Sequence, residues 1–183
     1  MTQALTETEQ RNLRTVEGVH PSWNRGDVEG VLAYYDDDIT WKNVALEEVY
    51  EGKAAVREFI TRLLTALPDL TFTGRYKIAR GDNVSEQWTI RGTHLGTFMG
   101  IPATGRAIEI FGMSMLTLRD GKFLRDEFYF DTGAVMRQMG LMPPLAATQG
   151  RAGRTFLWLA VTALNALTRG GRRARAARRA GAS

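Results

Sequence analysis

One acidic residue of this sequence lies among apolar residues in a predicted strand. Asp126 belongs to the run at residues 123–130, and period-2 alternation puts it on the same face as Phe128 and Phe130. An apolar setting raises the pKa of a carboxyl group because burial disfavours its charged form, and a carboxyl group that titrates near neutrality suits general acid or base chemistry. Asp126 is therefore the first candidate for proton transfer. The alternatives are an exposed position at the start of the strand or an ion pair with Arg125 or another nearby arginine.

Three other titratable residues are weaker candidates. His20 lies late in a predicted helix and could carry a proton near neutral pH, although a surface histidine at a bend beside Pro21 is an equally ordinary reading. His94 is typical of a hydrogen-bonding residue at a strand end, and alternation turns Glu127 away from the face of Asp126. The two histidines are far apart and cysteine is absent, so the sequence predicts neither a metal centre nor a disulfide.

The elements that would position these residues run from helices to strands, which indicates an α+β fold. Val56, Phe59, Ile60 and Leu63 have the spacing of one apolar helix face, and Asp120-Gly121 is a hairpin turn signal. We expect helices at about residues 6–24, 28–35 and 56–67, and strands at about 38–43, 70–78, 84–91, 107–118 and 123–130.

Charge is divided unevenly along the chain. The chain has 24 basic and 20 acidic residues, but eight arginines and no acidic residue follow Gln149. The part up to Gln149 therefore has 16 basic and 20 acidic residues, so the basic character belongs to the C-terminal segment and not to a pocket. The polar N-terminus contains no secretion signal, so we expect a cytoplasmic protein.

A succession of motifs connects the chain to a known family. The motifs are W-T-I-R-G-T-H at 88–94, I-E-I-F-G-M-S-M at 108–115, the turn R-D-G-K at 119–122, F-Y-F-D at 128–131 and M-R-Q-M-G at 136–140. This succession resembles the SnoaL-like polyketide cyclases and ester-cyclase-like proteins of the nuclear-transport-factor-2-like superfamily, over about residues 6–143. The resemblance implies an α+β cone, in which a curved antiparallel sheet and three or four packed helices enclose a single hydrophobic pocket. It also implies a small hydrophobic organic ligand and a reaction without a cofactor.

The resemblance also assigns the faces of the strands, which alternation alone leaves open. The family's pocket is lined by the face that contains the position of Phe128. The side chains that would then face the cavity come from three strands: Asp126, Phe128, Gly112, Ser114, Gln87 and Thr89. The first helix contributes pocket-wall residues in the family, which adds His20 as a second catalytic candidate.

Residue-by-residue comparison shows where the chain departs from the family's catalytic pattern. Phe128 occupies the position at which both the cyclases and the limonene-type epoxide hydrolases carry a carboxylate. Gln87 and Thr89 occupy the hydrolase's Arg and Asp positions. Trp41 and Asn43 match its Tyr and Asn positions, so only Asn43 is retained in kind. The hydrolase triad is absent, which argues against a limonene-type epoxide hydrolase.

Two functions remain open at this point. One is a cyclase or isomerase that moves a proton with Asp126, while Asn43, Gln87, Thr89 and Ser114 orient a carbonyl or stabilise an enolate oxygen. The other is a non-catalytic ligand-binding or association module, because the same neutral groups orient a ligand that never reacts.

The opposite face of the sheet would be apolar, with Trp88, Phe111, Met113, Met115 and Tyr129 exposed. Such an area indicates a partner, and sheet-to-sheet homodimers are common in the superfamily. The alternative is that the chain's own C-terminal segment covers this face.

The chain divides into a predicted cone domain at 1–145 and a C-terminal segment at 146–183. An apolar stretch at 155–168, too short to span a bilayer comfortably, precedes six arginines. This pattern is typical of a helix at a membrane surface, but it also fits a helix that docks on the body or on a second subunit. Nucleic-acid binding is disfavoured because no aromatic residue lies among the arginines.

Overall fold

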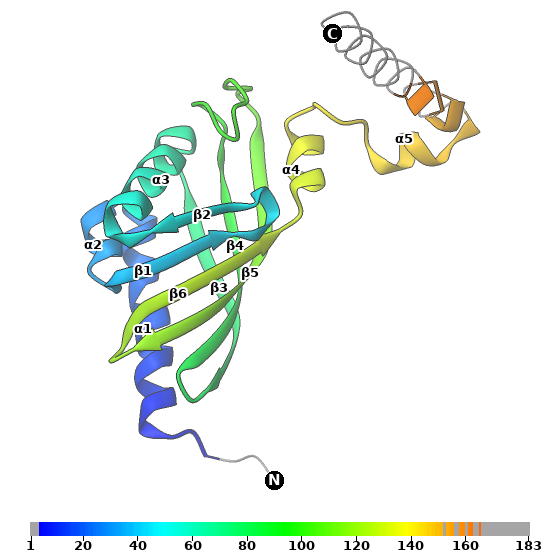
Figure 1. Cartoon of the computed structure of the whole chain (residues 1–183). Coiled ribbons are helices and arrows are strands. Elements are labelled where there is room, and N and C mark those ends of the chain that lie inside the picture. The colour runs from blue at the N-terminus through cyan, green and yellow to red at the C-terminus, as the bar shows by residue number, and fades with distance from the viewer. Residues whose placement is uncertain (1–3, 152, 156–157, 160, 163–164, 166–183) are drawn as a thin grey trace, which may run out of the picture. The chain divides into compact units, whose positions relative to one another are not determined.

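The computed structural model of the protein describes residues 4–151, 153–155, 158–159, 161–162 and 165. The chain divides into two compact units, Met1–Leu141 and Met142–Ser183. The first unit has a mixed α+β architecture, as predicted (Figure 1). Its elements are α1 (Glu7–Asn24), α2 (Val28–Leu32), β1 (Tyr35–Asn43), η1 (Val44–Leu46), β2 (Glu48–Glu51), α3 (Gly52–Ala66), β3 (Thr71–Arg80), β4 (Asn83–Thr93), β5 (Ala107–Arg119), β6 (Lys122–Phe130) and α4 (Thr132–Gln138).

One six-stranded sheet carries the site. Its strand order is β2-β1-β6-β5-β4-β3. The strands β3 to β6 form an antiparallel meander, whereas β1 pairs with β6 in parallel. This parallel pairing places the first long strand of the chain beside the last one.

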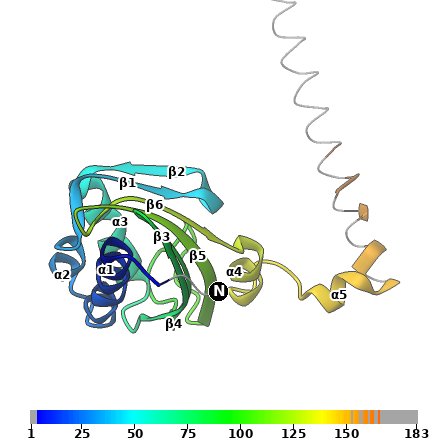
Figure 2. The ribbon, with the colours of Figure 1, turned by 90° about the horizontal axis from the view of Figure 1, so that it is seen from below.

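The sheet curves around the helices, as Figure 2 shows, with α1 and α3 on its concave side. This concave side is the inner face of the sheet. Helix α3 packs its predicted apolar stripe inward, because Val56, Phe59, Ile60 and Leu63 are all buried. Apolar side chains of the inner face join them in one core cluster. The core therefore lies between the sheet and these helices.

Helix α1 begins with a capping box and continues past its proline. The Thr6 side chain accepts from the backbone N–H of Glu9, and the Glu9 carboxylate accepts from the backbone N–H of Thr6. The helix runs through Pro21 to Asn24, as expected for residues 6–24, and so has a further turn after the proline. The extra turn extends the helix to Trp23, which is buried in the core.

Two local features decide which side chains face inward. Asp120 and Gly121 both have positive φ, at 52° and 76°, as a tight hairpin turn between β5 and β6 requires. The pairing of β3 with β4 shifts register between Gly74 and Lys77, so the alternation of β3 is not continuous. Tyr76 is consequently 76% exposed, whereas Phe72 on the same strand packs against the core.

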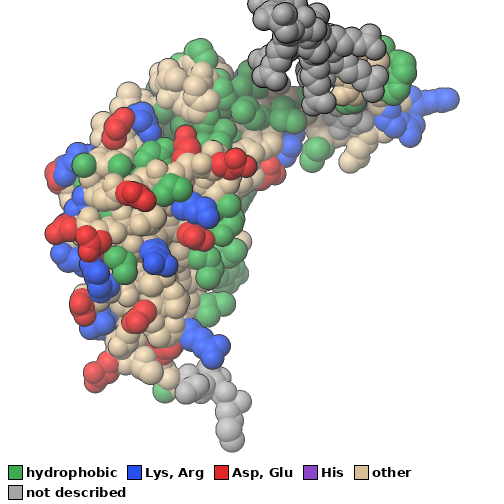
Figure 3. All heavy atoms as spheres, in the orientation of Figure 1, with side chains coloured by type: hydrophobic (Ala, Val, Ile, Leu, Met, Phe, Trp, Pro, Cys, Tyr) green, Lys and Arg blue, Asp and Glu red, His purple; other side chains and the backbone are tan. Residues whose placement is uncertain are grey.

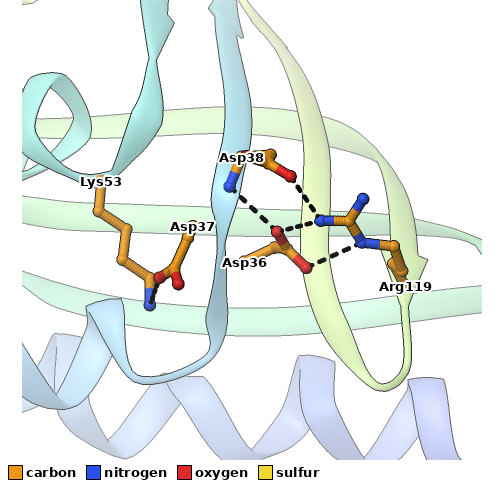
Figure 4. Close-up of polar contacts among 5 residues, drawn as sticks. All are labelled: Asp36, Asp37, Asp38, Lys53 and Arg119. Carbon is orange, nitrogen blue, oxygen red and sulfur yellow. Dashed lines mark hydrogen bonds and ion pairs between the residues drawn. The ribbon is translucent and has the colours of Figure 1, made fainter.

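A group of charged side chains fixes the start of β1 (Figure 4). Arg119, at the end of β5, donates to both carboxylate oxygens of Asp36, at 2.6 and 3.1 Å, and to Asp38 at 2.8 Å. Lys53 of α3 pairs with Asp37 at 2.6 Å. The Arg119 hydrogen bonds are the main reason that the pKa of Asp36 lies below its usual value. These contacts hold β1 where its pairing with β6 is irregular, just before Trp41.

The opposite side of the sheet is the outer face, and part of it is apolar. Phe111, Met113 and Met115 of β5 and Tyr129 of β6 are between 39% and 55% exposed. Figure 3 shows hydrophobic side chains gathered along the sheet side of the body, with mixed charges elsewhere. The prediction that these four side chains point outward is confirmed.

The described part of the second unit contains α5 (Leu145–Gln149) and further helical residues up to residue 165. Within the described residues, no helix is long and apolar enough to cross a membrane. The arginine-rich stretch at 169–179 lies outside the described residues.

Candidate functional site

A cavity opens between the inner face of the sheet and the helices. Four polar side chains lie in its wall: Asn43 of β1, Glu86 of β4, Ser114 of β5 and Asp126 of β6. Most of the other lining residues are aromatic, contributed by α1, α3 and several strands. An apolar, aromatic wall with a few convergent polar groups is typical of a site for a small organic molecule.

Asp126 is the titratable group most altered by this environment. Its side chain lines the cavity and the residue is 6% exposed. Burial raises the pKa of Asp126 to about 7, while side-chain hydrogen bonding from Ser114 and Trp41 lowers it in part and the negative charge of Glu86 adds a smaller rise. The carboxyl group can therefore hold or release a proton near neutral pH, as expected from its apolar neighbours.

Trp41 and Asp126 face the cavity side by side, because they are paired across β1 and β6. The indole Nε1 of Trp41 and Oδ1 of Asp126 are both buried, and neither atom makes a hydrogen bond of good geometry to a described residue, although Trp41 is near enough to Asp126 to lower its pKa. Buried polar atoms are almost always hydrogen-bonded, so two adjacent unpaired ones indicate a place for a polar group of a ligand. The Nε1 of Trp41 is a hydrogen-bond donor, and Oδ1 of Asp126 belongs to a carboxyl group that can accept or release a proton.

Trp88 lies across the cavity wall on top of Gly112. The two residues are opposite each other in the pairing of β4 with β5. A Cβ atom at Gly112 would lie 2.2 Å from Cη2 of Trp88, so only glycine leaves room for the ring. The Nε1 of Trp88 donates to Oγ of Ser114 at 3.0 Å, which fixes both side chains. Gly112 thus supports the wall and does not line the cavity itself.

The predicted positions of Gln87 and Thr89 were wrong, and so was the outward position of Trp88. Directly opposite residues of an antiparallel pair share a face, and Trp88 is opposite the inward Gly112, which puts Gln87 and Thr89 on the outer face. Gln87 is exposed, and Thr89 is buried but does not line the cavity. The family alignment shifts β4 by one residue relative to the structure, and a one-residue shift of register turns every side chain to the other face.

The remaining predicted ligand-binding residues lie in or beside the cavity. Phe128, Trp41 and Ser114 line it directly. Asn43 also lines it, but its Oδ1 accepts from the backbone N–H of Leu46 at 3.3 Å and caps η1. Asn43 therefore has less freedom to bind a ligand than its position in the sequence suggested.

Glu86 is a cavity residue that the sequence reasoning missed. It is 4% exposed, and His20, the second catalytic candidate, approaches it from α1 with Nε2 at 3.0 Å from Oε1. His20 does not line the cavity, so it reaches the site only through Glu86. The pattern that could have identified Glu86 is its position in β4 on the same face as the apolar residues Val84, Trp88 and Ile90.

His94 and Glu127 lie away from the cavity. His94 is fully buried, and its Nδ1 lies 3.0 Å from Oγ1 of Thr104, which fixes the loop before β5. Glu127 is turned to the outer face of β6, 3.9 Å from Lys42 Nζ. Of the described histidines and acids, no three are grouped to hold a metal ion.

The comparisons with known proteins agree with this geometry. The sequence pattern of the SnoaL-like polyketide cyclase family matches residues 14–139, and no curated protein matches the chain. Among solved structures, a provisionally assigned SnoaL-like polyketide cyclase from Jannaschia sp. CCS1 has a TM-score of 0.70 at 22% identity, over 78% of this chain and 100% of that one. AclR, a provisionally assigned hydroxylase from Streptomyces galilaeus, has a TM-score of 0.66 at 23% identity, over 74% and 99%.

A hypothetical protein from Catenulispora acidiphila with a ketosteroid isomerase-like fold, in complex with trimethylamine, has a TM-score of 0.62 at 16% identity, over 70% of this chain and 93% of that one. At these identities the structural matches establish the fold. The match to the family's sequence pattern extends over more than half of the chain and includes β1, β4, β5 and β6, the strands that carry the four polar cavity residues. The chain belongs to the SnoaL-like polyketide cyclase family.

Proposed function

We propose that the protein is a cofactor-independent cyclase or isomerase that moves a proton in a hydrophobic cavity, with Asp126 as the general acid and base. The observation that carries this proposal is the adjacent pair of unsatisfied groups, Asp126 Oδ1 and Trp41 Nε1, in an aromatic wall. The cyclase-type role of the family supports the same reading.

The reaction follows from the two groups. The Asp126 carboxylate takes a proton from a carbon next to a carbonyl, and the electron pair of the broken C–H bond forms an enolate. The N–H of Trp41 donates to the enolate oxygen and stabilises the charge that develops there. The enolate carbon then either attacks a second carbonyl, which closes a ring, or takes back the proton from Asp126 at another position, which isomerises the substrate.

Tyr35 also lines the cavity, and its side chain is neutral. Burial, with the charges of Asp126 and Glu86, raises the pKa of Tyr35 well above its usual value. Its phenol therefore stays protonated and leaves proton removal to Asp126.

Deuterium exchange tests the proposal without knowledge of the natural substrate. We expect the protein to accelerate exchange of the C1 hydrogens of 2-tetralone, a flat bicyclic ketone, in D2O followed by proton NMR. Glu127→Gln, which changes the neighbouring acid on the outer face, should exchange at the wild-type rate. No acceleration above buffer at any pH between 6 and 9 would favour the alternative, a binding module that holds its ligand without reaction.

We also propose that the outer face of β5 and β6 pairs with a second copy of the chain. The exposed Phe111, Met113, Met115 and Tyr129 support this proposal. Met113→Glu is expected to convert a dimer into a monomer in light scattering after gel filtration, because it buries a charge in the contact. Met142→Glu is the control, since Met142 is equally exposed, at 45%, outside the sheet. A monomeric wild type would contradict the proposal and leave the C-terminal segment as the candidate cover.

A further inference from the structure

A second carboxyl group faces the cavity from a different strand. Glu86 is opposite Ser114 across β4 and β5, whereas Asp126 is opposite Leu116 across β5 and β6. Because adjacent strands lie about 4.8 Å apart, the two acidic residues are separated by roughly 10 to 12 Å at their Cα atoms. Glu86 and Asp126 would therefore contact different atoms of one bound molecule.

Glu86 is held from behind by two cationic or titratable side chains. His20 Nε2 lies 3.0 Å from Oε1 and 3.3 Å from Oε2. Lys77 Nζ lies 3.5 Å from Oε1. The register shift in β3 turns Lys77 inward, and Gly74 leaves the space, since a Cβ there would lie 2.2 Å from Oε1 of Glu86 and 2.4 Å from Cε1 of His20.

These groups connect the cavity to solvent. The side chain of Glu86 is 5% exposed, those of His20 and Lys77 are 15% and 13% exposed, and that of Glu17, 3.5 Å from Lys77, is 64% exposed. A buried ion pair is a costly way to stabilise a core, because well-packed apolar residues of similar volume serve as well or better. A carboxylate that opens to a ligand cavity on one side and to a histidine on the other is the arrangement that a proton donor needs.

We propose that Glu86 is a second catalytic residue, which hydrogen-bonds an oxygen of the substrate and gives it a proton, with His20 as the positioning residue that supplies that proton. This inference rests on the proposed function, in which Asp126 removes the proton from carbon. The groups that face Glu86 are His20 of α1, Lys77 of β3, Tyr35 of β1 and Asp126 of β6, and Glu17 of α1 lies behind Lys77.

The proton balance is complete with the groups present. The C–H proton goes to Asp126, and its electron pair forms the new carbon–carbon bond to a second carbonyl. Protonated His20 gives its proton to the Glu86 carboxylate, and Glu86 passes a proton to the oxygen of that carbonyl as the new carbon–carbon bond forms. Asp126 then releases its proton and His20 takes one up, both by exchange with water.

A binding measurement tests the contact directly. 2,6-Dihydroxynaphthalene has a hydroxyl group at each end, and naphthalene has the same rings without oxygen. We expect Glu86→Gln to weaken binding of the diol at least about 10-fold, because a neutral hydrogen bond replaces one to a charged carboxylate, and to leave naphthalene within about 2-fold. Glu17→Gln, which changes the exposed acid at the same lysine, should alter neither. Unchanged diol binding would overturn the proposal, and so would an equal loss for naphthalene, because that would indicate a distorted cavity.

The role of His20 has its own measurement. In protein labelled with nitrogen-15 at histidine, the titration curve of the His20 ring should shift when the diol binds and should not shift in Glu86→Gln. A curve that is the same with and without the diol would mean that the pair is structural only, and would overturn the assignment of His20. Neither measurement uses turnover, so failure of 2-tetralone exchange would count against the proposed function and not against the Glu86 contact.

Discussion

Replacing Asp126 with Asn is expected to slow 2-tetralone exchange about 10²- to 10⁴-fold, the usual contribution of a general base. Asparagine has nearly the same shape but cannot accept the proton from carbon. In the wild type the rate should rise through about pH 7, where Asp126 loses its proton. Exchange rates from proton NMR between pH 5 and 9 would show this rise in the wild type and its absence in Asp126→Asn.

The same substitution is expected to stabilise the fold above neutral pH. Burial raises the pKa of Asp126 from 3.8 to about 7. Between these values the unfolded chain releases a proton that the folded protein keeps, so the free energy of unfolding falls as pH rises and stays low above pH 7. At 1.36 kcal/mol per pKa unit, this amounts to about 4 kcal/mol. Asp126→Asn should match the wild type near pH 4 and exceed it at pH 8.

Urea denaturation at pH 4 and pH 8 measures this effect, with Glu127→Gln as the control. A variant that is slower but no more stable at pH 8 would contradict the burial of a charged Asp126. The combination of lost activity and gained stability is the signature of a residue that is retained for chemistry at the expense of the fold.

Gly112→Val is the second substitution with a large expected effect. Its side chain would occupy the place of the Trp88 ring, which cannot stay where a Cβ comes within 2.2 Å of Cη2. Overpacking costs about 1 to 3 kcal/mol and the lost Trp88–Ser114 hydrogen bond about 1 kcal/mol more. We expect the free energy of unfolding in urea to fall by about 2 to 4 kcal/mol, with loss of naphthalene binding.

Two further variants test whether the loss in Gly112→Val comes from the contact between Gly112 and Trp88. Gly150→Val should be neutral, since no atom of the described residues lies within 4 Å of a Cβ at that position. Adding Trp88→Phe to Gly112→Ala should recover part of the stability lost in Gly112→Ala alone, because the smaller ring makes room. If Gly112→Val unfolds like the wild type, the close packing of Trp88 on Gly112 is contradicted.

The elements of this fold could be predicted from the sequence where a single periodicity continues without interruption. The apolar stripe of α3, the Asp120-Gly121 turn and the alternation of β6 all matched. The alternation placed Asp126 on an apolar face with Phe128 and Phe130, which predicted its raised pKa, whereas the family resemblance predicted that this face points inward. Each of these patterns lies within one element, so it can be recognised without knowledge of the neighbouring strand.

The errors arose where a face depends on pairing between strands. Alternation divides β4 into two sets of side chains, but only the pairing of Trp88 with Gly112 decides which set faces inward. The register shift of β3 likewise turns Lys77 towards Glu86 and leaves Tyr76 exposed. Neither the register nor the shift is encoded in a local pattern, so Glu86 was missed and Gln87 was misplaced.

The parallel pairing of β1 with β6 has a consequence for how the protein acquires its activity. Trp41 and Asp126 become neighbours only when two strands from opposite ends of the first unit meet. Contacts between distant parts of a chain form slowly, because a long loop must close before they contribute to stability. The helices and the β3–β6 meander can therefore form before β1 pairs with β6, and the protein stays inactive until that pairing brings Trp41 beside Asp126. Recovery of activity after dilution from urea is thus expected to follow the slowest step of refolding.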